Sequence, residues 1–272
     1  MSNAHFSRVA PTRRLEPPCE VQVGRTVTLF DIPIASVTLE QALDRIHMAI
    51  VGRERLELGV VNAAKIVNMK RDPELRDAVC SADVIYADGM SVVWASRILR
   101  TPLPERVTGI DLMYGILRRG AEHRYRIFCL GATSDVVRKV GATLAADYPG
   151  IQVVGCANGY FSADEEEGVA AAIREARPDV LFVGITSPKK ERFIARWSDS
   201  MDVPVVHGVG GSFDIVAGLT QRAPELWQKL GLEWFYRFKQ EPGRLWRRYL
   251  VTNVAFMWMV LRERIRRLTK SR

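Results

Sequence analysis

The chain has 272 residues, 47% of them hydrophobic and 26% charged, and this composition excludes a disordered, collagen-like or disulfide-rich protein. Its four cysteines (Cys19, Cys80, Cys129 and Cys156) are far apart and form no CxxC pair. We therefore expect no structural zinc site and a reduced, cytoplasmic protein. The length fits one large α/β domain with an appendage, or two small domains.

The net charge of +8 is concentrated at the C-terminal end of the chain. Residues 233–272 contain 11 Lys or Arg and three Glu, so residues 1–232 hold 28 basic and 28 acidic residues. A polyanionic partner is therefore expected to meet the tail rather than the body.

Three segments follow one another along the chain. Residues 1–24 lack the apolar region of a signal peptide and are predicted to form a flexible arm, residues 25–223 an α/β domain, and residues 224–272 a helical appendage. A hairpin is predicted over 26–35, and a capping-box pattern at Thr38 begins a helix that ends near Val51. Apolar strand patterns then occur at 56–61, 84–87, 126–130, 152–156, 180–185 and 203–207. Helical patterns separate or follow them, at 63–69 and onward, 90–99, 110–119, 135–147, 165–175 and 191–199.

This alternation predicts a Rossmann-like fold, with a mostly parallel sheet and helices on both of its faces. In such a sheet ligands bind where strands end and helices begin. Five predicted strands are followed by small, polar or Gly-rich loops, at 62–65, 87–90, 131–134, 184–191 and 208–214. Because glycine lets backbone N–H groups approach an anion closely, these loops favour a phosphate-bearing ligand. No Walker A, GxGxxG, GxSxG or DxD motif is present.

Several side chains in these loops have a functional and a structural interpretation. Asp88 follows a strand and precedes Gly89, so it is either a general base or the N-cap of a helix. Asp214 has the same two interpretations, and Arg106 either binds a phosphate or pairs with a neighbouring carboxylate. His207 is expected to cap a strand, and Glu191 could serve as a first-turn helix residue.

The C-terminal appendage is predicted to be helical, with a break at Pro242-Gly243. Residues 249–261 are uncharged but too short to span a bilayer, and arginines flank them. A helical wheel places apolar residues on one arc: Trp246, Tyr249, Leu250, Phe256, Met257, Val260 and Leu261. It places Arg248, Thr252, Arg262 and Arg266 on the opposite side. The pattern favours a helix lying on an anionic membrane surface, and the alternative is a core or dimer-interface helix with a basic edge.

Read together, these segments resemble the WecG/TagA/CpsF family of bacterial glycosyltransferases, from about Thr28 to Leu261. The ordered motifs are Asn62, Ala87-Asp88-Gly89, Arg106-Val-Thr-Gly109-Ile-Asp111, Leu130-Gly131-Ala132, Gly184-Ile-Thr-Ser-Pro188-Lys189-Lys190-Glu191 and Gly208-Val-Gly-Gly-Ser-Phe-Asp214. They continue with Arg222-Ala-Pro224, Leu230-Gly-Leu-Glu233, Tyr236-Arg237, Gln240-Glu-Pro242 and Arg244-Leu-Trp-Arg247-Arg248-Tyr249. Each motif is weak alone, but their order is specific.

The resemblance implies an inverting, metal-independent enzyme without a cofactor, which moves a sugar from a UDP-sugar to a polyprenyl-diphosphate-linked saccharide. Asp88 matches the family's general base and Arg106 its diphosphate-binding arginine. Arg237, Arg244, Arg247 and Arg248 are expected to serve the lipid diphosphate and the membrane. The residues expected to bind substrate are Asn62, Gly89, Arg106, Asp111, Gly131, Ala132, Lys189, Lys190, Glu191, Gly210, Gly211, Ser212, Phe213, Asp214 and Arg222.

The chain departs from many family members at Lys190, where they carry Gln, and at Val60, where they carry Thr. The transferred sugar is therefore left open between an N-acetylmannosamine type and a glucose type. We expect peripheral attachment to the inner face of the cell membrane and no nucleic-acid partner, and leave a homo-oligomer open. The alternative function is that of a non-catalytic nucleotide-binding module with a membrane-binding tail. An NAD-dependent dehydrogenase lacks its glycine fingerprint here.

Overall fold

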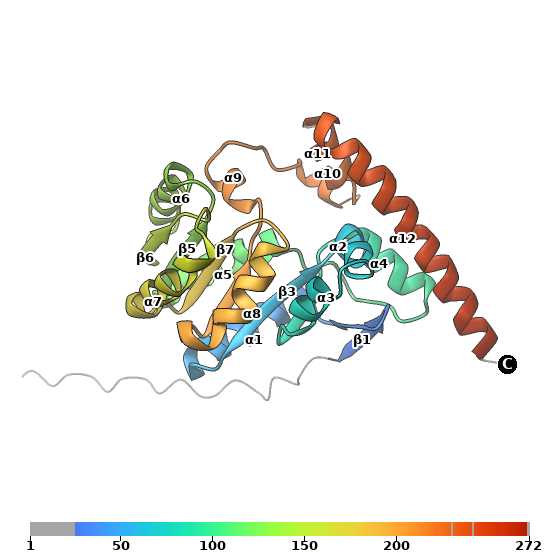
Figure 1. Cartoon of the computed structure of the whole chain (residues 1–272), viewed down its shortest axis with the longest axis horizontal. Helices are drawn as coiled ribbons and strands as arrows, with labels where there is room; N and C mark the ends of the chain where they lie inside the picture. The colour runs from blue at the N-terminus through green and yellow to red at the C-terminus, as the bar shows by residue number, and fades with distance from the viewer. Residues whose placement is uncertain (1–24, 230, 241, 271–272) are drawn as a thin grey trace, which may run out of the picture.

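A parallel sheet forms the centre of the molecule (Figure 1). The computed structural model describes residues 25–229, 231–240 and 242–270, and the side chains at 229, 237, 244–249 and 270 are not described. The six strands lie in the order β4-β3-β8-β7-β5-β6. Their bounds are β3 Leu56–Val61, β4 Val84–Ala87, β5 Arg126–Gly131, β6 Gln152–Ala157, β7 Val180–Gly184 and β8 Val205–Gly208. The predicted fold class is confirmed.

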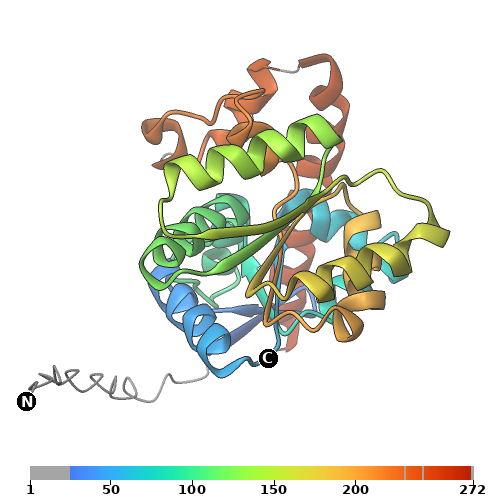
Figure 2. The same ribbon diagram turned by 90° about the vertical axis from the view of Figure 1, so that its left-hand side faces the viewer.

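Helices cover both faces of this sheet, as Figures 1 and 2 show. One face packs against α1 (Leu39–Gly52), α5 (Gly109–His123), α6 (Ser134–Asp147) and the short α9 (Ser212–Val216). The other face packs against α2 (Ala63–Met69), α3 (Pro73–Cys80), α4 (Met90–Ile98), α7 (Glu166–Ala176, after the 3-10 turn η1 at Ala163–Glu165) and α8 (Lys189–Met201). The strands are buried on both sides, which explains why they read as nearly continuous apolar runs.

The N-terminal hairpin lies beside the sheet and joins its core. Strands β1 (Thr26–Leu29) and β2 (Ile32–Ala35) pair antiparallel, as predicted. Leu29, Phe30 and Ile34 are buried in the same apolar cluster as the side chains of α2 and α4. The predicted capping box begins α1, where Thr38 Oγ1 accepts from Gln41 N and Gln41 Oε1 accepts from Thr38 N.

The C-terminal appendage consists of α10 (Glu225–Lys229), α11 (Glu233–Gln240) and α12 (Pro242–Lys270). One stripe of α12 packs on α2, α4 and the hairpin, with Thr252, Phe256 and Val260 buried. The Phe256 ring contacts the Phe30 ring edge-on at 5.6 Å. At the far end of the helix, Arg267 donates to the carbonyls of Leu99 and Thr28.

This packing corrects the predicted orientation of the helix. Thr252, expected on the polar side, lies on the buried stripe, because Thr252, Phe256 and Val260 follow a spacing of four residues. Phe256 and Val260 were expected on one arc with Met257 and Leu261, but the latter two remain exposed. The division at 223/224 remains a prediction, although α12 shares a core with the α/β body.

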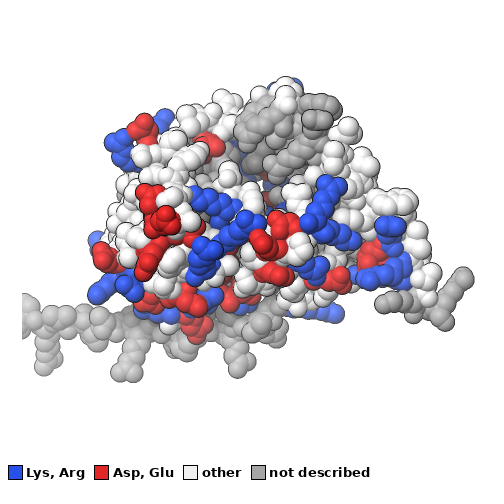
Figure 3. Space-filling model, in the orientation of Figure 1, with Lys and Arg blue, Asp and Glu red and all other residues white. Residues whose placement is uncertain are grey.

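A second apolar face of α12 points away from the body. Its exposed members are spaced along the helix at Leu250, Val254, Trp258, Ile265 and Leu268, and we call them the outer stripe. Among the described residues, no helix is long and apolar enough to cross a bilayer. Over the α/β body, acidic and basic side chains are interspersed on the face in Figure 3.

Candidate functional site

A crevice is expected between β3 and β8, where the chain leaves the sheet in two directions. The loop after β3 leads to α2 on one face of the sheet, and the loop after β8 leads to α9 on the other. Asn62 follows β3, Asp88 follows the neighbouring β4, and the Gly-rich loop 208–211 follows β8. The topology therefore gathers three of the five predicted loops at one point.

The Asp88 carboxylate is held at this edge of the sheet by two segments of the body. Its Oδ1 accepts from Gly109 N at 3.0 Å, and its Oδ2 lies 3.4 Å from the donor Nδ2 of Asn62. Gly109 is the first residue of α5, so the carboxylate sits at the positive end of that helix. Gly89, and not Asp88, occupies the N-cap position of α4.

A buried histidine fixes the other side of Gly109. His207 on β8 is fully buried, and its Nε2 donates to the Gly109 carbonyl at 2.8 Å. Burial lowers the pKa of His207 to about 4, so the ring is neutral at physiological pH. The expected strand-end role is thus refined: His207 links β8 to the start of α5 and so supports the group that binds Asp88.

Two arginines of the predicted site are each paired with a carboxylate. Arg106 Nη1 lies 3.2 Å from Oε2 of Glu233 on α11, and both side chains are mostly buried. Arg222 pairs with Asp111, whose other oxygen accepts from Thr108 Oγ1 at 2.7 Å. Both cations are therefore near the carboxyl ends of the strands, each beside a carboxylate that an incoming anion could replace.

A buried chain of charges lies behind Asn62. Lys65, one turn along α2, places its Nζ 2.9 Å from Glu191 Oε1, and Lys190 Nζ lies 3.5 Å from the same oxygen. Burial and the neighbouring Lys65 lower the pKa of Lys190 to about 8. Burial alone would raise the pKa of Glu191, but the two ammonium groups lower it to about 2. Glu191 is thus a buried ion-pair partner, and its contact with substrate stays a prediction.

Sequence reasoning missed two members of this region, Lys65 and Glu57. Burial and the adjacent Asp83 raise the pKa of Glu57 to about 7. Glu57, Lys65, Lys190 and Glu191 line one small cavity. A signal for Glu57 was present, because it is the one charged residue in the apolar run of β3. For Lys65 the only signal in the sequence is its place at the end of the predicted loop 62–65.

Five of the remaining predicted residues lie in or directly after the loop that follows β8. Gly210 has φ +53, and a Cβ placed on it would meet no atom within 4 Å, so the loop after β8 is open above it, beside Gly211 and the exposed Asp214. Ser212 Oγ donates to Val209 O, and Phe213 is buried against Gly184, so both face the protein.

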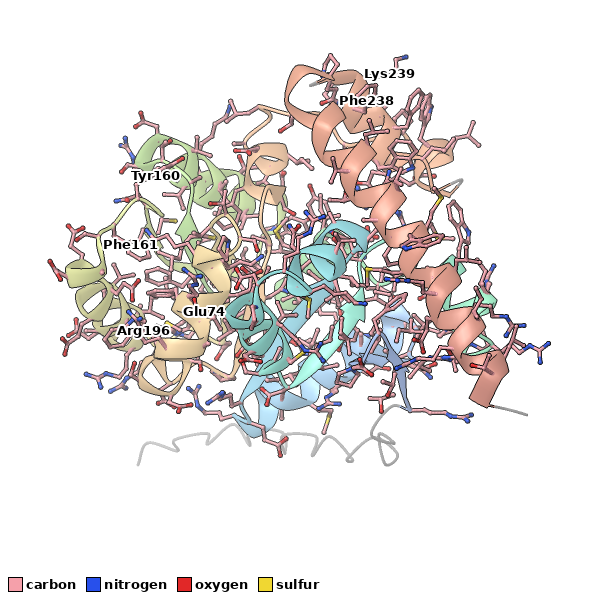
Figure 4. The ribbon with its side chains drawn as sticks, turned by 45° about the vertical axis from the view of Figure 1, so that its right-hand side comes forward. Glu74, Tyr160, Phe161, Arg196, Phe238 and Lys239 are labelled. Atoms are coloured by element: carbon pink, nitrogen blue, oxygen red, sulfur yellow. The ribbon has the colours of Figure 1, made fainter. Side chains whose placement is uncertain are left out.

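The loop after β5 lies further along the sheet. Gly131 has φ +145, and a Cβ there would lie 2.5 Å from the Gly184 carbonyl carbon, so only glycine fits. Ala132, with φ +53, follows it. Lys189 is bound to the loop after β6: its Nζ donates to Phe161 O at 2.6 Å and lies 4.0 Å from the Phe161 ring centre. Figure 4 shows Tyr160 and Phe161 on the side of the molecule opposite the appendage.

The appendage closes over the start of α4. A Cβ on Gly231, between α10 and α11, would lie 2.8 Å from Met90 Cβ and 3.2 Å from the Trp94 ring. Aromatic side chains hold α10 to α11, and the labelled Phe238 and Lys239 lie at the end of this unit in Figure 4. The side chains of Arg237, Arg244, Arg247 and Arg248 lie outside the described part of the structure. Their predicted role stays a prediction.

Comparison with known proteins identifies the family. The model of the glycosyl transferase WecG/TagA/CpsF family matches residues 27–270. An N-acetylglucosaminyldiphosphoundecaprenol N-acetyl-beta-D-mannosaminyltransferase of Bacillus subtilis (strain 168) is 32% identical over 227 residues, covering 83% of this chain and 88% of that protein. A protein of the same name from Bacillus spizizenii (strain ATCC 23059 / NRRL B-14472 / W23) is 36% identical over 180 residues, covering 66% of this chain and 69% of that protein. The chain therefore belongs to the WecG/TagA/CpsF family, and it is an enzyme, a glycosyltransferase.

Proposed function

We propose that this enzyme transfers a hexose from a UDP-sugar to a hydroxyl of a polyprenyl-diphosphate-linked saccharide, with inversion at the anomeric carbon. The observation that carries the proposal is the Asp88 carboxylate, fixed at the carboxyl end of β4 by Gly109 N and Asn62 Nδ2. The relatives named above act on a polyprenyl-diphosphate-linked N-acetylglucosamine, which supports the same class of acceptor here.

The chemistry is a single in-line displacement. The acceptor oxygen forms a bond to the anomeric carbon while the bond from that carbon to the β-phosphate oxygen breaks, and Asp88 takes the hydroxyl proton. One displacement without a covalent sugar–enzyme intermediate inverts the configuration. The N-terminus of α5 donates its first backbone N–H to Asp88 and so orients the carboxylate before the acceptor arrives.

Cationic side chains are proposed to stabilise the departing UDP without a metal. Arg106 and Arg222 are each paired with a carboxylate at the edge of the site, and guanidinium groups bind diphosphate oxygens in a bidentate manner. Among the residues that the structure describes, no three His, Cys, Asp or Glu side chains gather as metal ligands would. The proposal therefore assigns charge neutralisation to the arginines and to backbone N–H groups of the Gly-rich loops.

The transferred sugar is proposed to be of the N-acetylmannosamine type, because both relatives are named for it. The glucose type stays the second candidate, since Lys190 replaces the usual family glutamine and is buried beside Glu191.

We further propose that the enzyme docks peripherally on the anionic inner face of the cell membrane. The outer stripe of α12 supports this, because Val254, Trp258 and Ile265 are between 53% and 56% exposed on a helix that also carries basic residues. Co-sedimentation with phosphatidylglycerol vesicles at low and high salt tests the docking. A protein that stays in the supernatant even at low salt contradicts it.

The activity is tested by measuring UDP release from several UDP-sugars with a lipid-diphosphate saccharide acceptor, with and without EDTA. We expect transfer from one hexose donor, unchanged by chelation. The same assay compares Asp88→Asn with Asp77→Asn, an exposed aspartate on α3. A general base contributes about 10²–10⁴-fold, so only the first variant should lose turnover to that extent. Loss of activity with EDTA that added metal restores would refute metal independence.

A further inference from the structure

An apolar groove runs between α4 and α12, separate from the crevice at Asp88. Trp94, Ala95 and Ile98 form one wall, Phe256, Met257, Val260 and Leu261 form the other, and Ser91 and Arg264 lie along it. Its volume of about 400 Å³ is in the range of small-molecule sites, and its lining is almost entirely apolar. Trp94 and Ile98 are 44% and 52% exposed, so the groove is open to a ligand.

The groove begins beside the candidate catalytic carboxylate. Ser91 is in the first turn of α4, three residues after Asp88, and a Cβ on Gly89 would lie 3.5 Å from Ser91 Oγ and 3.7 Å from Asn62 Cβ. From Ser91 to Ile98 the helix rises about 10 Å at 1.5 Å per residue. A molecule with a polar head near Asp88 and an apolar tail could therefore occupy both places at once.

We propose that this groove binds the first isoprene units of the acceptor's polyprenyl chain. The inference rests on the proposed function, which gives the acceptor a saccharide-diphosphate head and an isoprenoid tail. The head would enter the crevice while the tail follows α4 outward, between its apolar side chains and those of α12. Arg264 also lines the groove, and an arginine can pack its alkyl stem on apolar surface while its guanidinium reaches water.

The groove and the outer stripe are different surfaces of α12. The groove is walled by α4, whereas Val254 and Leu268 of the outer stripe do not line it and are 53% and 50% exposed. A bilayer would contact the outer stripe, and one isoprenoid chain that leaves the bilayer would bind in the groove. The two roles can be separated by substitution, because Ile98 and Leu261 of the groove are exposed, as are Val254 and Leu268 of the outer stripe.

The experiment uses the full chain and detergent-free acceptors that carry the same saccharide diphosphate on one, two, three or four isoprene units. For the unmodified protein, kcat/KM should rise at least tenfold from one to three units, because each buried methylene contributes to binding. The double variant Ile98→Ser/Leu261→Ser should flatten this dependence. The matched variant Val254→Ser/Leu268→Ser should keep the dependence and lose binding to phosphatidylglycerol vesicles.

Several outcomes would overturn the proposal. A kcat/KM that is independent of chain length in the unmodified protein assigns the groove to the membrane surface. A dependence that survives in the groove variant places the tail elsewhere. A change of molecular mass in the groove variant during sedimentation velocity makes a second copy of the chain the occupant.

A calorimetric titration with farnesyl diphosphate measures binding to the groove separately from sugar transfer. It therefore distinguishes this proposal from the proposed function. Binding that the groove variant loses, without transfer to any acceptor, supports the groove and contradicts the proposed function. Sugar transfer to the acceptor without binding of farnesyl diphosphate supports the proposed function and contradicts the groove.

Discussion

The two sides of the candidate site are built from different contacts. On the body side, Asp88 is held by Asn62 and by Gly109, and Gly109 is in turn fixed by the buried His207. On the appendage side, the Arg106–Glu233 pair is one link to the body, and α12 presents a stripe of exposed apolar side chains. The comparison teaches that the proposed general base is held by polar contacts within the body, whereas the surface beside it is apolar and suits a lipid.

Within α12, two adjacent residues show most clearly the difference between the packed face and the exposed face. Phe256 is 4% exposed against Phe30, whereas Met257 is 64% exposed. We expect Phe256→Ala to lower the free energy of unfolding by about 3–5 kcal/mol, because it leaves a cavity in a shared core. Met257→Ala should change it by about 0.5 kcal/mol or less. Urea denaturation of both variants checks this, and equal effects would mean that α12 is not packed on the body as described.

The buried charges behind Asn62 should contribute more to the free energy of unfolding than an exposed ion pair does. Lys65→Met leaves Glu191 buried with only the more distant Lys190, so we expect a loss of about 3 kcal/mol in the free energy of unfolding. The matched control is Arg192→Met, which breaks the exposed pair between α8 and Glu74 and should cost about 1 kcal/mol or less. A Lys65 variant as stable as this control would show that the chain of charges does not stabilise the body.

The stability of the body should also depend on the protonation of Glu57. Its pKa of about 7 in the folded protein is above the ordinary value of 4.5, so the folded protein holds a proton in this interval that the unfolded chain releases. This contribution to stability is full below pH 4.5 and is lost as the pH rises through 7, amounting to at most about 3 kcal/mol.

Glu57→Gln removes that dependence. The variant should gain stability relative to the unmodified protein as the pH rises from 4.5 through 7, as measured by urea denaturation at several pH values. Glu54→Gln, at an exposed glutamate just before β3, is the control. A constant difference between Glu57→Gln and the unmodified protein across this range would contradict the raised pKa.

Much of this fold could be predicted from local patterns. The predicted strands agree closely with the observed ones, because buried parallel strands are apolar on both faces and end in polar loops. Asp88, Asn62 and the loop after β8 could be placed together from topology alone. The buried stripe of α12 could not be predicted. A helical wheel of a helix with two apolar faces does not indicate which face packs on the body.

The buried charge network was out of reach for a related reason. Lys65 and Glu191 are 126 residues apart, and their pairing depends on how α2 and α8 pack on the sheet. Sequence patterns report periodicity within an element, and they contain no information on which charged residues of two distant helices meet. Glu57 was visible as a charge in an apolar strand, but its partners were not.

The most direct test of the division between the two sides is the turnover of two variants on two forms of acceptor. Asp88→Asn should lose about 10²–10⁴-fold in kcat with both a water-soluble short-chain acceptor and the same head group embedded in vesicles, while its affinity for the UDP-sugar is unchanged. Val254→Ser/Leu268→Ser should retain turnover on the soluble acceptor and lose it only on vesicles. Full turnover of Asp88→Asn on the soluble acceptor would contradict the account.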